Sequence, residues 1–180
     1  PSVPVGKDDS GNVEIRKWGK IPKFDFEIKD HIAIAEGLGL LDLERAANIA
    51  AARFYYLKGD LVKLDLAIAM YALDFLTKEK KFKPWLVPVL IKNKALYAAG
   101  FLPLARADLY KIEGEDLNLI GTAEHPLCGL HIDEILEEKD LPLRYCGFSP
   151  CFRTEAGSHG RDTKGFFRVH QFNKIEQFIF

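Results

Sequence analysis

Two strand-like runs near the carboxyl end constrain the fold of this chain more than any other feature. They span residues 145–152 and 166–180 and enclose a polar loop that holds Gly157, Gly160 and Gly165. Strand-like runs on either side of a glycine-containing turn are typical of an antiparallel hairpin. The sequence therefore predicts a two-stranded hairpin at this end of the chain.

Basic residues stand on both sides of the turn in this hairpin. Arg153 lies at the start of the loop, Arg161 and Lys164 lie inside it, and Arg168 lies at its end. A hairpin brings the two flanking guanidinium groups near one point, and glycine lets the backbone pass close to a ligand. Because the guanidinium fork matches phosphate oxygens, the pattern indicates a polyphosphate clamp.

Two carboxylates accompany these arginines. Glu155 follows Arg153 closely, and Glu176 lies in the second strand-like run. Carboxylates beside a phosphate clamp suit a ligand that carries an amine or a hydroxyl group. Arginines on a hairpin are more often plain surface cations, so their presence alone does not decide between the two interpretations. Taken together, the residues indicate a site for a nucleotide and an amino acid.

Composition excludes several classes of protein. The chain has 180 residues, 48% hydrophobic and 28% charged, with a net charge of -1. This charge excludes a strongly basic nucleic-acid-binding protein, and no apolar run reaches the roughly 20 residues of a membrane-spanning helix. The chain has no initiator Met and no apolar signal core, and its three cysteines suit a reducing cytosol. We expect a cytoplasmic protein with no membrane segment.

The chain is expected to form an amino-terminal arm over 1–29 and one domain over 30–180. The arm is polar and interrupted by proline and glycine. The first elements expected in the domain are a helix over 30–38, a helix over 42–52 capped by Asp42, a strand over 53–57 and a long helix over 60–80. The next are a strand over 85–91, a strand over 117–120 and a helix from about Pro126 to 138.

The helix over 60–80 is apolar almost all round, which indicates burial on two sides. The strand-like run after it contains Pro88, which favours the edge of a sheet because proline cannot donate to a ladder. A two-sided helix next to an edge strand predicts a homodimer interface. Since strands and helices are joined mostly by non-βαβ connections, we expect an α+β fold with a largely antiparallel sheet flanked by helices.

Metal binding by the protein is not expected. Cys128 and His131 are three residues apart and could share a ligand, but no third ligand has a supporting spacing. Cys128, Cys146 and Cys151 are expected to be small buried apolar residues.

Three segments resemble motifs of the class II aminoacyl-tRNA synthetases, in the order of that family. Phe-Arg-Thr-Glu at 152–155 and Arg-Val-His-Gln-Phe at 168–172 resemble the second motif. Gly-Thr-Ala-Glu at 121–124 resembles the serine-binding Thr-x-Glu loop of the seryl-tRNA synthetases. Residues 81–90 resemble the first motif, with Pro88 as its proline. The resemblance runs over essentially the whole chain and implies a class II synthetase fold, incomplete in this chain.

This resemblance implies a role for each matching residue. Arg153 is expected to be the catalytic residue that holds the α-phosphate of ATP, and Phe172 is expected to stack on adenine. The other expected ATP-binding residues are Thr154, Glu155, Arg168 and Val169. The expected serine-binding residues are Thr122, Ala123, Glu124, Arg153 and Glu176. A fixed arginine would offset the negative charge that gathers on the α-phosphorus as the adenylate forms.

The resemblance also implies a reaction and its partners. Serine and ATP would give seryl-adenylate and pyrophosphate, and the seryl group would then pass to the 3′ end of tRNA(Ser). Mg²⁺ would bridge the ATP phosphates, with protein ligands beyond Phe180. The third motif and the tRNA-binding helical arm of the family are absent from this sequence. We therefore expect these residues to belong to a longer protein and to be inactive alone.

Two other functions remain open at this point. An amino acid:carrier-protein ligase would share the fold without the tRNA arm, and would be expected to hold its amino acid with zinc. A non-catalytic, dimerising synthetase relative would share the fold without the reaction. The presence of Arg153, Glu155 and Arg168 together favours a catalytic site over this last possibility.

Overall fold

The computed structural model describes residues 5–156 and 165–180. The chain divides into two compact units, residues 1–30 and residues 31–180. In the first unit, the described residues are exposed and include a short 3₁₀ turn over Asp9–Gly11. All the residues of the expected ATP and serine sites belong to the second unit.

A three-stranded sheet in the order β3-β6-β7 forms the centre of the second unit. Strand β6, Arg144–Phe152, pairs with β7, Gln171–Ile179, in antiparallel register along its whole length. Strand β3, Lys83–Leu86, pairs in parallel with the first half of β6. The predicted hairpin is confirmed, although its second strand begins at Gln171 and not at residue 166. Some predicted loop residues lie outside the described residues, namely Gly157, Gly160, Arg161 and Lys164.

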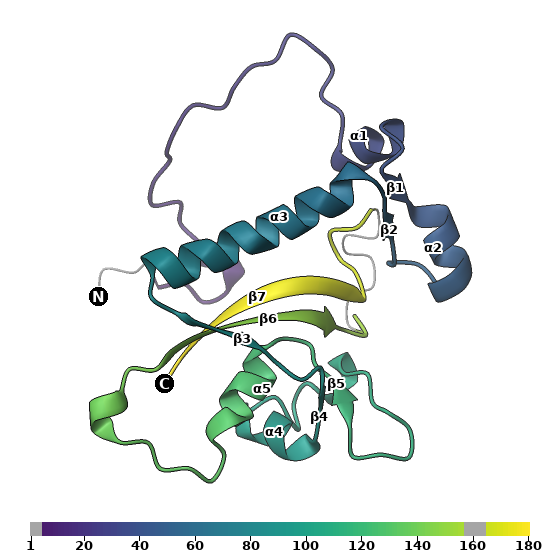
Figure 1. The fold of residues 1–180 in the computed structure, drawn as a ribbon. Helices are drawn as coiled ribbons and strands as arrows, with labels where there is room; N and C mark the ends of the chain where they lie inside the picture. Colours follow the sequence, from purple (N-terminus) through teal and green to yellow (C-terminus); the bar gives the residue numbers. More distant parts are fainter. Residues whose placement is uncertain (1–4, 157–164) are drawn as a thin grey trace. The chain divides into compact units, whose positions relative to one another are not determined.

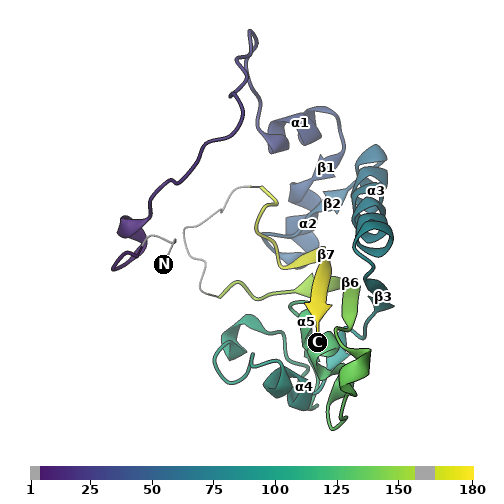
Figure 2. The ribbon, with the colours of Figure 1, turned by 90° about the vertical axis from the view of Figure 1, so that its left-hand side faces the viewer.

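The two faces of this hairpin have different neighbours. Helix α3, Asp60–Asp74, packs on one face, and helix α5, Glu124–Cys128, contacts the other (Figure 1). The two helices again lie on opposite sides of the hairpin in the view of Figure 2. Directly paired residues share a face of an antiparallel pair, and successive residues alternate between faces. The even-numbered positions of β7 therefore lie toward α5, and the odd-numbered positions lie toward α3.

Two smaller antiparallel pairs complete the strands. Strand β1, Leu41–Asp42, pairs with β2, Tyr56–Leu57. Strand β4, Leu90–Ile91, pairs with β5, Asn118–Leu119. The expected strand at 117–120 is confirmed as β5, which carries the chain directly into the Thr-Ala-Glu segment.

Two predicted strands differ from the structure. The single strand expected over 85–91 is wrong, because the chain leaves the central sheet after β3 and joins β5 as β4. Pro88 lies between the two strands and has no N–H to continue a ladder. The strand expected over 53–57 is reduced to β2, since Arg53 takes a left-handed backbone conformation with a φ of 66°. Strand β1 was not predicted.

Most of the predicted helices are present. Helices α1 and α2 span His31–Gly37 and Leu43–Ala50, and an unpredicted helix α4 spans Asn93–Ala98. Asp42 caps α2 as expected, because its Oδ1 atom accepts from the Arg45 N–H at 3.0 Å. The helix expected from Pro126 to 138 is wrong in length. It ends at Cys128 with a glycine as its C-cap, and a 3₁₀ turn follows.

Helix α3 packs on the sheet through one side only. It continues into a π-helical turn over Phe75–Glu79, and Leu76 there joins Phe82 and Cys146 in a buried cluster. A second buried cluster lies under β4 and α4, and consists of Ile91, Leu96, Leu102, Leu109 and Ile120. Within the described residues, no helix has both the length and the apolar character needed to cross a membrane.

Candidate active site

The loop after β5 lies close against the sheet face that Glu176 occupies. Thr122 and Ala123 in this loop are buried. Gly147, which pairs directly with Glu176, makes this close approach possible. A Cβ atom at Gly147 would lie 2.8 Å from the Cβ atom of Ala123, closer than two carbon atoms can pack. The absence of a side chain at this position therefore sets the distance between the loop and the strand.

A hydrogen-bonded network joins the loop to β7. The Thr122 hydroxyl donates to Oε2 of Glu176 at 2.6 Å. The Lys174 ammonium donates to the Thr122 hydroxyl oxygen at 2.9 Å and forms an ion pair with the same Oε2 atom of Glu176. Lys174 and Glu176 are two residues apart on β7, so both side chains project from the face that meets the loop.

The network keeps Glu176 ionised. Burial alone would raise the pKa of this carboxyl, but hydrogen bonds from Lys174 and Thr122 oppose it. The positive charges of Lys174 and Arg153 act in the same direction, so the pKa of Glu176 lies below its ordinary value. At neutral pH the site therefore presents a carboxylate, which accepts hydrogen bonds.

Arg153 connects this network to an aromatic ring. Its Nε atom donates to the Gly121 carbonyl at 3.2 Å, and its guanidinium carbon lies 5.1 Å from the centroid of the Phe172 ring. A cavity of about 220 Å³ opens here, lined by Phe101, Asp108, Gly121, Thr122 and Arg153. The cavity joins a cation, an acidic residue and the threonine of the network in one space, which suits a small polar ligand.

Backbone contacts fix the residues that follow β6. The Arg153 N–H donates to the carbonyl of His170 at 3.0 Å. The Thr154 N–H donates to the carbonyl of Asp108 at 3.2 Å, and its hydroxyl donates to the carbonyl of Ala107 at 2.5 Å. These bonds hold Arg153 at the end of the hairpin, where the two strands and the 107–108 segment meet.

Arg168 and Glu155 form the other charged pair at this end. The Arg168 Nε atom donates to Oε2 of Glu155. Glu155 has a left-handed backbone conformation with a φ of 56°, which is uncommon for a residue with a side chain. Val169, the next residue after Arg168, is buried. The two arginines expected in one clamp therefore have different partners, Arg153 with Phe172 and Gly121, and Arg168 with Glu155.

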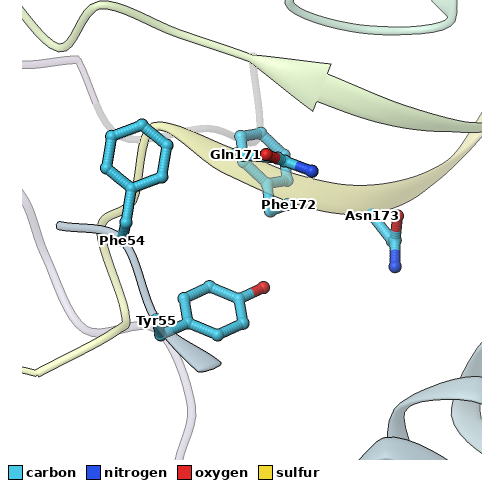
Figure 3. A pocket seen from close by; sticks show the side chains of 5 residues that line it. All are labelled: Phe54, Tyr55, Gln171, Phe172 and Asn173. Carbon is cyan, nitrogen blue, oxygen red and sulfur yellow. The ribbon is translucent and has the colours of Figure 1, made fainter. Parts of the chain in front are cut away.

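A second pocket lies beside Phe172. It has a volume of about 130 Å³ and is lined by Phe54, Tyr55, Gln171, Phe172 and Asn173. Figure 3 shows the rings of Phe54, Tyr55 and Phe172 around this space, contributed by the segment before β2 and by β7. Aromatic rings beside an arginine offer the flat apolar surfaces on which a planar base can stack.

Comparison with known proteins relates this chain to a family. Residues 109–180 match the tRNA synthetase class II core domain (G, H, P, S and T). The serine–tRNA ligase of Nitrosopumilus maritimus is 56% identical over 179 residues, which cover 99% of this chain and 42% of that protein. The chain belongs to the seryl-tRNA synthetase family.

Solved structures of seryl-tRNA synthetases agree with the fold. The enzyme from Pyrococcus horikoshii, complexed with ATP, has a TM-score of 0.90 at 46% identity, over 99% of this chain and 44% of its own. The cytoplasmic serine–tRNA ligase of Naegleria fowleri, in complex with AMP, has a TM-score of 0.89 at 40% identity, over 99% of this chain and 43% of its own. The predicted α+β class II fold is confirmed. The chain spans less than half the length of the seryl-tRNA synthetases that it matches.

The structure brings together most of the residues that the synthetase motifs indicated. Thr122, Ala123, Arg153 and Glu176 meet around the loop after β5. Glu124, by contrast, is exposed as the first residue of α5, and its N–H donates to the Thr122 hydroxyl oxygen at 3.2 Å. Its carboxylate has no described contact with the network.

Sequence reasoning missed two residues of this candidate site. Lys174 is one of them, although the spacing of Phe172, Lys174 and Glu176 on one strand places them on one face. Asp108, which lines the cavity, follows an irregular loop and carries no signal in its local sequence.

His125 lies behind this site and is uncharged. Burial, together with the charges of Lys174 and Arg153, lowers the pKa of His125 to about 4. Its ring packs against Phe101 with a centroid distance of 4.4 Å, and neither ring nitrogen has a hydrogen-bond partner in the described part of the chain. Among the described residues, no three histidine, cysteine or carboxylate side chains gather at a point where they could bind a metal ion.

Proposed function

We propose that the protein containing this chain is a serine–tRNA ligase, which activates serine with ATP and transfers it to tRNA(Ser). The observation that carries the proposal is the convergence of Arg153, Thr122 and Glu176 beside Phe172. The Arg153 guanidinium suits the phosphate of a seryl-adenylate, the Glu176 carboxylate suits its seryl group, and the Phe172 ring suits its adenine. The likeness to serine–tRNA ligases over nearly the whole chain supports the same substrates.

In the first step, a carboxylate oxygen of serine attacks the α-phosphorus of ATP. The new O–P bond forms as the bond to the bridging oxygen breaks, and pyrophosphate leaves. Arg153 would hold the α-phosphate and offset its growing negative charge. No protein base is required, because the serine carboxylate is already ionised and positioning does the work. The second step moves the seryl group to a terminal hydroxyl of tRNA, and AMP leaves.

The remaining residues would divide the substrate between them. Phe172 would stack on the adenine, while Thr154, Glu155, Arg168 and the backbone at Val169 complete the nucleotide site. Thr122, Ala123, Glu124 and Glu176 would form the serine site with Arg153. Mg²⁺ would arrive with the ATP phosphates as part of the substrate, and the described residues supply no ligand cluster for it.

The proposal is tested by serine-dependent exchange of labelled pyrophosphate into ATP, measured with the full-length protein. Arg153→Ala is expected to lower the exchange rate about 100- to 1,000-fold, the effect of removing one group that stabilises charge in a transition state. Exchange near the wild-type rate in this variant would remove Arg153 from the assignment. Lys94→Met, which breaks an exposed ion pair on α4, serves as the control and should leave exchange unchanged.

Pyrophosphate exchange and a separate assay for the transfer of serine to tRNA(Ser) together distinguish the two alternative functions. A carrier-protein ligase would show exchange but would transfer no serine to tRNA(Ser). A non-catalytic relative would show no exchange at all. We also propose that the protein is a cytoplasmic homodimer. Its likeness to the cytoplasmic Naegleria enzyme supports the location, and the exposed apolar side chains of α3 support the assembly.

A further inference from the structure

Lys174 lies at the centre of the serine site without a role in the proposed reaction. It stands between Phe172 and Glu176 on the face of β7 that meets the loop, opposite the buried Ser149 of β6. Its side chain is 30% exposed, and that of Glu176 is 19% exposed. A lysine at this depth gives up part of its hydration, so the bonds it makes there have to replace water.

With the contact from Lys174, every hydrogen-bonding position of the Thr122 hydroxyl is occupied. This group has one hydrogen, which it donates to Glu176, and its oxygen accepts from the Lys174 ammonium and from the Glu124 N–H. A hydroxyl offers one donor and two acceptor positions, so all three are used within the protein. Thr122 therefore contributes to the proposed serine site through its bond to Glu176, because its own hydroxyl has no free position for a substrate while the network is intact.

The same network leaves part of Glu176 free for a substrate. The described contacts from Thr122 and Lys174 both fall on Oε2 of the carboxylate. Oε1 can accept a further hydrogen bond, and two bonds to Oε2 fix the plane in which it lies. The side chain that receives the substrate hydroxyl is thus aligned by its neighbours before a substrate arrives.

We propose that Lys174 is a positioning residue for serine selection, which holds the Glu176 carboxylate aligned and ionised as the acceptor for the substrate hydroxyl. This inference rests on the proposed function. A serine hydroxyl would donate to Oε1 of Glu176, whereas alanine would leave that atom unpaired in the site. An unpaired buried acceptor costs far more binding energy than the loss of one contact, so the aligned carboxylate rejects alanine.

Several groups face Glu176 and influence its titration. From β7 comes the Lys174 ammonium, from the end of β6 the Arg153 guanidinium, and from the loop the Thr122 hydroxyl. From α5 comes His125, which is neutral above a pH of about 4. Because the pKa of Glu176 lies below its ordinary value, the preference for serine should be present at neutral pH and should be lost as the pH falls through that pKa. Removal of the Lys174 charge raises the pKa of Glu176, so the preference should be lost at a higher pH.

The test compares Lys174→Met with the wild type in the full-length protein. The measurement is the pH dependence of kcat/KM for serine and for alanine in pyrophosphate exchange. We expect kcat/KM for serine at neutral pH to fall about 10- to 100-fold, as for a lost hydrogen bond to a charged group. The acid limb of the pH profile for serine should move to higher pH, and the ratio of kcat/KM for serine to kcat/KM for alanine should decrease. Lys94→Met on α4 should change none of these quantities.

Two further variants assign the effect to the right group. Glu176→Gln should lack the acid limb, both alone and combined with Lys174→Met, which excludes His125 as its source. Lys174→Gln keeps a donor for Thr122 without a charge and should move the limb as Met does. This variant also answers the question if Lys174→Met fails to fold.

This inference would be overturned if a folded Lys174→Met or Lys174→Gln protein kept both the wild-type acid limb and the wild-type ratio of kcat/KM for serine to kcat/KM for alanine. The proposed function would remain intact. A wild-type protein without serine-dependent exchange would overturn both. A uniform loss of kcat/KM for serine and alanine, with no movement of the limb, would also overturn it, because such a loss indicates a structural ion pair.

Discussion

At the scale of single residues, the proposed function assigns the selection of serine to Glu176. Steric exclusion rejects amino acids larger than serine, but alanine is smaller and enters any pocket that serine enters. A site can reject alanine only through a polar group that alanine leaves unpaired. Glu176 meets this requirement, because it is largely buried and ionised and keeps one carboxylate oxygen without a described partner in the network.

Replacement of this carboxylate should damage selection more than nucleotide binding. In Glu176→Ala, we expect kcat/KM for serine to fall and the preference for serine over alanine to narrow on the order of a hundredfold. The KM for ATP should remain near its wild-type value, since Arg153 and Phe172 keep their mutual contact. The ratio of kcat/KM for the two amino acids is the useful measurement, because general damage to the fold cancels in it. An unchanged ratio would place the hydroxyl contact elsewhere.

Strand β6 shapes the site at the scale of secondary-structure elements. On the face toward α5 it presents Gly147, Ser149 and Cys151 in succession, and the latter two are fully buried. Their partners on β7 are Glu176, Lys174 and Phe172. Small residues on one strand thus leave the room in which the long side chains of its neighbour meet the loop after β5.

Gly147→Ala tests this spacing. The added methyl group would overlap Ala123 and approach the Leu127 side chain at 3.1 Å, so the loop would move away from Glu176. We expect a loss of about 1–3 kcal/mol in the free energy of unfolding, as for an overpacked core. The KM for serine should rise while the KM for ATP changes little. Gly37→Ala is the matched control, because a methyl group there meets no other atom within 4 Å. Equal KM values for serine in the two variants would contradict this account of Gly147.

The elements differ in how far the sequence determined them. The hairpin and the Asp42 cap were predictable because each depends on residues close together in the chain. The parallel pairing of β3 with β6 joins segments that are far apart, and no local pattern specifies a parallel partner. Helix α5 is shorter than predicted because Gly129 caps it and the chain turns there. The residues of the candidate site divide in the same way. Motif residues were predicted from their resemblance to a family, whereas Asp108 reaches the cavity only through tertiary packing, which no local pattern specifies.

At the scale of the whole molecule, α3 has an outer side without a described partner. Its half-buried residues recur at about four-residue intervals and face the sheet. The exposed apolar side chains on the same helix are Val62, Leu64, Leu66, Ile68, Met70 and Tyr71. They lie in two rows on either side of the sheet-facing residues, and so many exposed apolar side chains on one helix are unusual on a free surface. They support the proposed contact between two copies of the protein.

A charge among these exposed apolar side chains should prevent assembly. Ile68→Glu is expected to convert a dimer of the full-length protein into monomers or into insoluble protein, because a carboxylate buried in an apolar interface loses its hydration. Sedimentation at micromolar concentration gives the measurement. The control is Ile135→Glu, at an apolar residue that is 95% exposed in a loop, which should sediment like the wild type. A wild-type protein that sediments as a stable monomer would rule out the proposed dimer.

The alternation along β7 also limits which insertions and deletions the gene can tolerate. Phe172, Lys174 and Glu176 lie on the face of the candidate active site. Asn173 and Ile175, on the opposite face, meet α3, where the Asn173 amide donates to Asp65 at 3.3 Å. Loss or gain of one codon within this strand would exchange the two sets of side chains, and so would ruin the pocket and the helix packing together. Substitutions in β7 can be judged one face at a time, but a single-codon change in length acts on both faces at once.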